Sequence, residues 1–119
     1  EFERNLILLL ESNGWFIFSP EKFTIFEQVS IFSKASIVVG LHGAGMCGMI
    51  WVNELTKIIE ILPIRRIQVY FRMAEQLGLD YSQIYISKLD PTGTLRAEDI
   101  AAIIKAELDT LIAEGSEFK

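Results

Sequence analysis

Short apolar runs alternate along the chain with stretches whose apolar residues have helical spacing, and this alternation limits the possible folds more than any other feature. The runs that predict strands cover residues 15–18, 36–40, 57–62 and 83–87. The run at 36–40 is continuously β-branched rather than alternating, as in parallel strands that are covered on both faces. Strands that alternate with helices form parallel sheets, because each right-handed crossover lays a helix across the sheet. The sequence therefore predicts an α/β fold: a Rossmann-like, doubly wound parallel sheet with helices on both faces.

Apolar residues three and four positions apart predict the helices that connect these strands. The predicted apolar faces consist of Phe2, Leu6, Leu9 and Leu10; of Val29, Phe32 and Ala35; of Val69, Met73 and Leu77; and of Ile100, Ile103, Ile104, Leu108 and Leu111. Asn13-Gly14 and Gly78 are typical of left-handed helix ends, and residues 24–27 fit a capping box. A short helix is expected over 46–52 and a turn over 90–93.

Length and composition predict a single globular domain over residues 1–119. Half of the residues are hydrophobic, which favours a packed interior over disorder. The formal net charge of -5 argues against nucleic acid as a partner. Because Cys47 is the only cysteine and His42 the only histidine, neither a disulfide framework nor a zinc site is expected. No apolar run approaches the roughly 20 residues of a membrane span.

Residues 42–48, His-Gly-Ala-Gly-Met-Cys-Gly, connect a predicted buried strand to a predicted helix. Glycines let the backbone turn sharply and let a ligand approach it, and free amides at a helix start favour a phosphate. Gly43, Gly45 and Gly48 also have the G-x-G-x-x-G spacing of dinucleotide-binding folds, in which an acid near the position of Glu60 binds a ribose. Both patterns predict a ligand that carries a ribose and a diphosphate. The alternative is that the glycines only permit tight packing of the helix on the strand.

His42 distinguishes this loop from a dinucleotide-binding loop, which needs no imidazole before its glycines. A histidine at the carboxyl end of a strand can donate to a phosphate or to a sugar hydroxyl. It can also act as a general base if its pKa is near neutral. The residue type leaves a third role open, in which the ring nitrogens only bind backbone groups.

Further motifs follow in a fixed order over residues 2–81. They are Phe26-Glu27-Gln28 with Phe32 and Ala35, residues 37–46 (IVVGLHGAGM), residues 59–63 (IEILP), Tyr70 with Ala74, and residues 77–81 (LGLDY). In order and spacing they resemble the C-terminal region of glycosyltransferase family 61. Members of this family are GT-B enzymes that transfer a sugar from a nucleotide donor with inversion and without an obligatory metal. Cys47-Gly48 departs from the family pattern, which often has a small polar residue and Asn at these positions.

The resemblance implies a donor site in which Glu60 faces the ribose or the sugar, and in which the diphosphate is contacted by His42, Gly43, Ala44, Gly45 and Met46. It implies a glycosyltransferase of polysaccharide biosynthesis, similar to capsular polysaccharide biosynthesis proteins. The donor would be a nucleotide sugar, most simply UDP-linked, the acceptor a glycan or another hydroxyl compound, and no cofactor or metal would be needed.

The same resemblance implies that the chain is the nucleotide-sugar-binding half of a longer two-domain protein. The base that activates the acceptor would then lie in the missing N-terminal domain, and this half alone would be inactive. Its exposed inter-domain face offers a surface for homodimer formation. We expect a cytoplasmic protein, peripheral to the inner membrane if it is bacterial.

Four further side chains are candidates for the site. Glu27 and Gln28 could reach the donor, although the capping box already explains Glu27. Arg65 and Arg66 could neutralise a diphosphate, although exposed arginines are usually solvated.

Two functions of other classes compete with the transferase. A nicotinamide- or flavin-dependent oxidoreductase is favoured by the glycine spacing and by Glu60, and opposed by His42. A non-catalytic interaction domain is the second, because a fold does not determine a function. Failure to bind any nucleotide diphosphate would favour it. A hydrolase would need the G-x-S-x-G nucleophile elbow and a P-loop enzyme would need G-x-x-x-x-G-K, and the chain has neither.

Overall fold

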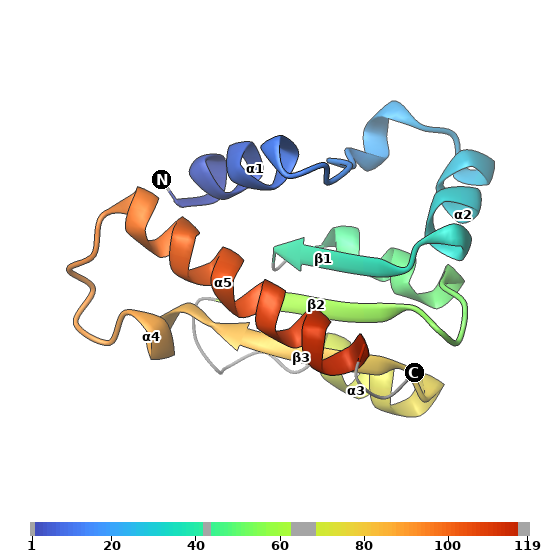
Figure 1. Ribbon diagram of the computed structural model, residues 1–119. Coiled ribbons are helices and arrows are strands. Elements are labelled where there is room, and N and C mark those ends of the chain that lie inside the picture. The colour runs from blue at the N-terminus through green and yellow to red at the C-terminus, as the bar shows by residue number, and fades with distance from the viewer. Residues whose placement is uncertain (1, 42–43, 63–68, 117–119) are drawn as a thin grey trace. The chain divides into compact units, whose positions relative to one another are not determined.

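A computed structural model describes residues 2–41, 44–62 and 69–116 (Figure 1). Its contacts divide the chain into two compact units. One unit contains residues 19–85 and therefore the whole sheet, and the other contains residues 1–18 and 86–119. The prediction of a single domain over 1–119 stays a prediction.

The sheet of the first unit has three parallel strands in the order β1-β2-β3. Their bounds are β1 Ile37–Leu41, β2 Lys57–Leu62 and β3 Asp80–Tyr85, and Figure 1 shows all three running in one direction. Strand β2 is the central strand, and from Ile58 to Leu62 it is fully buried. The predicted parallel α/β fold is confirmed. A run of three parallel strands in one direction is the pattern of one half of a Rossmann-like sheet.

Two crossovers connect these strands. The 3-10 helix η2, Ala44–Trp51, lies between β1 and β2, and helix α3, Val69–Leu77, lies between β2 and β3. Because both crossovers step in the same direction across the sheet, the right-handed rule places them on the same face. Their contact supports this placement: Met49 of η2 and Ala74 of α3 share a core cluster with Ile58 of β2.

Helix α2, Ile25–Lys34, precedes β1 and packs against η2. The short 3-10 helix η1, Pro20–Lys22, lies before it. At the other end of α2, the buried Thr56 hydroxyl donates to the Ala35 carbonyl oxygen at 2.8 Å. The Asn53 side-chain amide donates to the Ser33 carbonyl oxygen at 2.9 Å. These bonds attach the segment that enters β2 to the segment that enters β1, which fixes the start of both strands.

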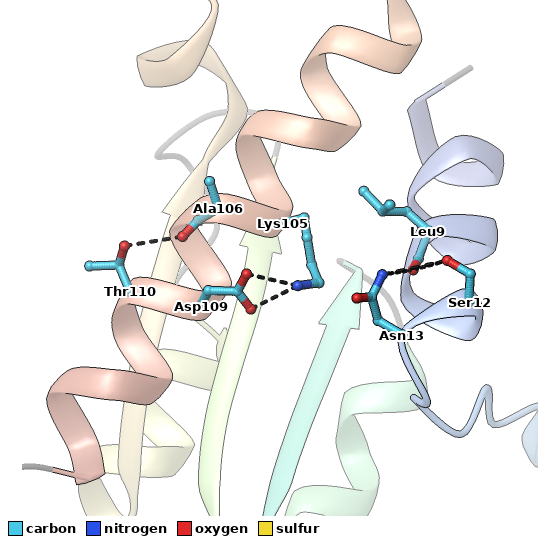
Figure 2. A network of polar contacts seen from close by, with 7 residues as sticks. All are labelled: Leu9, Ser12, Asn13, Lys105, Ala106, Asp109 and Thr110. Carbon is cyan, nitrogen blue, oxygen red and sulfur yellow. Dashed lines mark hydrogen bonds and ion pairs between the residues drawn. The ribbon is translucent and has the colours of Figure 1, made fainter.

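The second unit consists of α1, Phe2–Ser12, α4, Ile86–Leu89, and α5, Ala97–Ser116. Helices α1 and α5 lie side by side (Figure 1) and contribute the buried residues Leu6, Leu10, Ala101, Ile104 and Leu108. Figure 2 shows polar contacts on both helices, among them an ion pair of 2.7 Å between Lys105 Nζ and Asp109 Oδ2. Two side chains at the end of α1, those of Ser12 and Asn13, donate to the Leu9 carbonyl oxygen (Figure 2).

The predicted helix ends are confirmed in atomic detail. Gly14 has φ 87° and Gly78 has φ 68°, in the left-handed region where glycine carries no steric penalty. After α1, the Trp15 amide donates to the Leu10 carbonyl and the Gly14 amide to that of Glu11. The same two bonds recur after α3, where Leu79 and Gly78 are the donors. Both helices therefore end in a Schellman motif.

Two predicted strands were wrong in whole or in part. Residues 15–18 form no strand; Phe16 is 66% exposed, so this short apolar run lacks the burial that a central strand requires. The last strand begins at Asp80 and ends at Tyr85, not at 83–87. The full length of β2 sets these bounds, because Lys57 pairs with Asp80 and Leu62 with Tyr85.

Candidate functional site

The candidate site lies at the carboxyl edge of the sheet. The strands β1, β2 and β3 end there with Leu41, Leu62 and Tyr85, and open α/β sheets bind ligands at this edge. Leu41 pairs with Ile61, and Gly40 with Glu60. Glu60 therefore lies in register with the residue before Leu41, two residues before His42 in the chain.

Several predicted site residues lie outside the described part of the chain. These are His42, Gly43, Arg65 and Arg66. The backbone at Ala44, Gly45 and Met46 is described and forms the first turn of η2. The predicted short helix at 46–52 is thus present, but as a 3-10 helix that begins at Ala44. A 3-10 helix leaves the amides of its first turn without acceptors inside the helix, as an α-helix does.

Gly48 has a packing role. A Cβ built on it would lie 2.4 Å from Cε2 and from Cζ of Phe32 in α2, closer than any such contact in a relaxed structure. Any larger residue at position 48 would therefore force the Phe32 ring of α2 to shift. The third glycine of the G-x-G-x-x-G spacing is explained by this contact with a helix, whereas in dinucleotide-binding folds it permits close packing of helix and strand.

Glu60 is the one buried charged residue in the described part of the chain, with 1% of its surface exposed. A buried carboxylate is costly unless hydrogen bonds compensate it. The Tyr81 hydroxyl of β3 supplies one such bond by donating to Glu60 Oε1. No buried side-chain nitrogen or oxygen among the described residues lacks a partner.

A chain of hydrogen bonds extends from this carboxylate along β3. The Gln83 side-chain nitrogen donates to the Tyr81 hydroxyl oxygen at 3.1 Å, and the Tyr85 hydroxyl donates to Gln83 Oε1. All four side chains project from one face of the sheet, because Glu60 pairs with Gln83 in register and the β3 residues are two positions apart. It is the face that η2 and α3 cover, since Tyr81 packs against the core cluster of Met49 and Ile58.

The environment of Tyr81 keeps its hydroxyl protonated. Partial burial, followed by the hydrogen bond to Glu60, raises the pKa of Tyr81 well above its usual value. The phenol therefore remains a hydrogen-bond donor to the Glu60 carboxylate at physiological pH.

Glu27 and Gln28 are held by local contacts. Glu27 Oε1 accepts from the Thr24 amide at 2.8 Å, and the Glu27 amide donates to the Thr24 hydroxyl at 3.2 Å. The predicted capping box is confirmed. The Gln28 side-chain nitrogen donates to the carbonyl oxygens of Pro20 and Phe23 at 2.9 and 3.2 Å. These bonds fold residues 19–24 onto α2, and they give no support to a donor contact by either side chain.

Tyr81, Gln83 and Tyr85 were not predicted as site residues. Their alternation along one strand is a signal in the sequence, as is the need of a buried Glu60 for a partner. The register between β2 and β3, which joins these two signals, becomes visible only in the structure.

The described residues offer neither a metal site nor a membrane-spanning helix. They contain no group of three or more His, Cys, Asp or Glu side chains arranged to hold a metal ion. None of the helices formed by these residues has the length and apolar character needed to cross a membrane.

Comparison with known proteins gives two matches. Residues 3–59 match the model of a family described as Glycosyltransferase 61. The chain is also 29% identical over 83 residues to a beta-1,2-xylosyltransferase of Arabidopsis thaliana. That match covers 67% of this chain and 15% of the relative, so the chain spans a small part of the relative's length. No solved structure matches the chain.

Proposed function

We propose, from the match of residues 3–59 to the model of glycosyltransferase family 61 and from the similarity to a xylosyltransferase, that the chain is a member of this family. It would then be part of an enzyme that transfers a sugar from a nucleotide-sugar donor to a hydroxyl group of a glycan or another acceptor. The observation that carries the proposal is the buried Glu60 at the carboxyl edge, next in register to the strand that leads into His42-Gly43-Ala44-Gly45. Such an edge is where α/β sheets bind nucleotides.

In this proposal the chain is the nucleotide-sugar-binding half of a GT-B enzyme. The first turn of η2, Ala44 to Met46, faces the donor diphosphate, and Glu60 accepts hydrogen bonds from the ribose or the sugar. His42 and Gly43 complete the diphosphate contacts, and Arg65 adds positive charge. The other half of the enzyme supplies the acceptor site and the base that deprotonates the acceptor hydroxyl.

The proposed reaction is a displacement with inversion at the anomeric carbon. The acceptor oxygen forms a bond to this carbon while the bond to the nucleoside diphosphate breaks, and the acceptor proton goes to the base. Negative charge then develops on the leaving diphosphate. Backbone amides at a helix start stabilise such charge without a metal ion, and His42 can donate a further hydrogen bond. This chemistry is compatible with a role in polysaccharide biosynthesis.

The test is binding of nucleotides by isothermal titration calorimetry to the 119-residue chain and to its His42→Ala variant. UDP, GDP, CMP and NAD are compared first. UDP-xylose and UDP-glucose follow, because the Arabidopsis relative is named as a xylosyltransferase. Saturable UDP binding that weakens in His42→Ala supports the proposal. Binding of NAD without UDP, GDP or CMP would contradict it and favour the oxidoreductase alternative.

A further inference from the structure

We infer that Tyr81 is a positioning residue of the proposed donor site: its hydroxyl fixes the carboxylate of Glu60, and Gln83 and Tyr85 fix that hydroxyl in turn. The inference rests on the proposed function for the identity of the ligand. The positioning itself rests on contacts within the sheet, and it is tested below without a ligand as well as with one.

The donors in this chain of hydrogen bonds all point toward Glu60. A side-chain amide nitrogen can only donate, so Gln83 Nε2 uses an acceptor site of the Tyr81 hydroxyl. The single proton of Tyr81 is then left for Glu60 Oε1. The Tyr85 proton is directed to Gln83 Oε1, which fixes the orientation of the amide. Hydrogen bonds that run in one direction polarise and strengthen each other.

The ring of Tyr81 cannot turn away from this position without disturbing the core. It packs against the cluster of Met49, Ile58, Tyr70 and Ala74. It also meets the ring of Phe71 in α3, with 6.2 Å between the ring centroids and 57° between the ring planes. One end of Tyr81 is thus held by apolar packing while the other end binds a carboxylate. Side chains locked in this way hold a binding group in the geometry that a ligand requires.

The two neighbouring strands present different residues to Glu60. Its register partner on β1 is Gly40, which contributes no side chain, and its register partner on β3 is Gln83. The described hydrogen bond to the carboxylate comes from Tyr81 on β3.

The first measurement needs no ligand. The side-chain carboxyl carbon of Glu60 is observed by NMR in the wild-type chain and in the Tyr81→Phe variant, which keeps the ring and its packing. Tyr85→Phe is the matched control. It removes a hydroxyl from the same strand, but this hydroxyl reaches Glu60 only through Gln83 and Tyr81. We expect a clear shift of the Glu60 resonance in Tyr81→Phe and a smaller one in Tyr85→Phe. An unchanged resonance in Tyr81→Phe overturns the inference.

The second measurement separates positioning from general support of the fold. UDP affinity is measured for Tyr81→Phe, Glu60→Gln and the double variant. Loss of one hydrogen bond corresponds to about a fivefold weaker affinity for Tyr81→Phe. If Tyr81 acts through Glu60, its substitution has little further effect in the Glu60→Gln background. Fully additive losses would overturn the inference. If the wild-type chain and its variants bind no nucleotide, the proposed function fails, and the NMR comparison alone decides whether Tyr81 positions Glu60.

Discussion

Gly48 of η2 lies against the ring of Phe32 in α2, so closely that a Cβ on Gly48 would come within 2.4 Å of two ring carbons. Phe32 is itself buried, with 6% of its surface exposed, and its ring also meets that of Trp51, with 6.2 Å between the ring centroids. The ring therefore has little room to move. Packing of α2 on η2 is a sufficient reason for glycine at this position, whatever the loop before it binds.

We predict that Gly48→Ala destabilises the chain by about 1 to 3 kcal/mol, the usual cost of overpacking a core. The measurement is urea unfolding followed by circular dichroism. Phe32→Leu in the same chain shortens the opposing side chain, so the double variant should lose less stability than the sum of the two single variants. Unchanged stability in Gly48→Ala would mean that the Phe32 ring can shift at no cost.

Variants of the capping box at the start of α2 can show whether Glu27 only caps the helix or also contacts the donor. Thr24→Ala removes the hydroxyl that accepts from the Glu27 amide, and we expect a loss of about 1 kcal/mol in unfolding free energy. Glu27→Gln keeps a side chain that can close the box, so stability should change little. UDP affinity should also be unaffected by Glu27→Gln. A marked loss of UDP affinity in this variant would instead assign Glu27 to the donor site.

Thr56 joins the entry of β2 to Ala35, the residue directly after α2. Its side chain is fully buried and its hydroxyl donates to the Ala35 carbonyl oxygen at 2.8 Å. Thr56→Val keeps the shape but leaves this carbonyl without its donor, and we predict a loss of about 1 to 3 kcal/mol. Thr56→Ser retains the hydroxyl and loses only a methyl group. It should be the more stable of the two variants in urea unfolding; the reverse order would show that packing outweighs the hydrogen bond here.

The helix ends and the strand that depend on residues close together in the sequence were predicted correctly. The glycines at 14 and 78 end their helices as expected, and Thr24 begins the next one through its own side chain. The strand at 57–62 was predicted to the residue from its short, mostly apolar run.

Prediction failed where distant parts of the chain decide the outcome. The run at 15–18 has the composition of a strand, but composition does not guarantee a place in a sheet. The bounds of β3 follow from its pairing with β2, and so does the contact between Tyr81 and Glu60. A buried Glu60 needs a partner, yet the partner is set by a register that no local pattern contains.

The raised pKa of Tyr81 predicts a loss of stability at alkaline pH. In the unfolded chain this phenol releases its proton near pH 10, whereas in the folded chain partial burial and the Glu60 hydrogen bond raise its pKa and retain the proton. The folded state then binds more protons, so its stability is complete below pH 10 and falls as the pH rises above that value. The slope cannot exceed about 1.4 kcal/mol per pH unit, since Tyr81 releases a single proton, and solvent screening of the partly exposed hydroxyl lowers the total effect.

The measurement is the free energy of unfolding in urea between pH 8 and pH 11 for the wild-type chain and for Tyr81→Phe. Phenylalanine cannot ionise, so the variant lacks this contribution while other tyrosines and lysines titrate in both proteins. We expect the wild-type chain to be the more stable one at pH 8, and its advantage to shrink steadily above pH 10. An advantage that is constant over the whole range would show that Tyr81 ionises equally in the folded and unfolded states, which contradicts a hydroxyl held by Glu60.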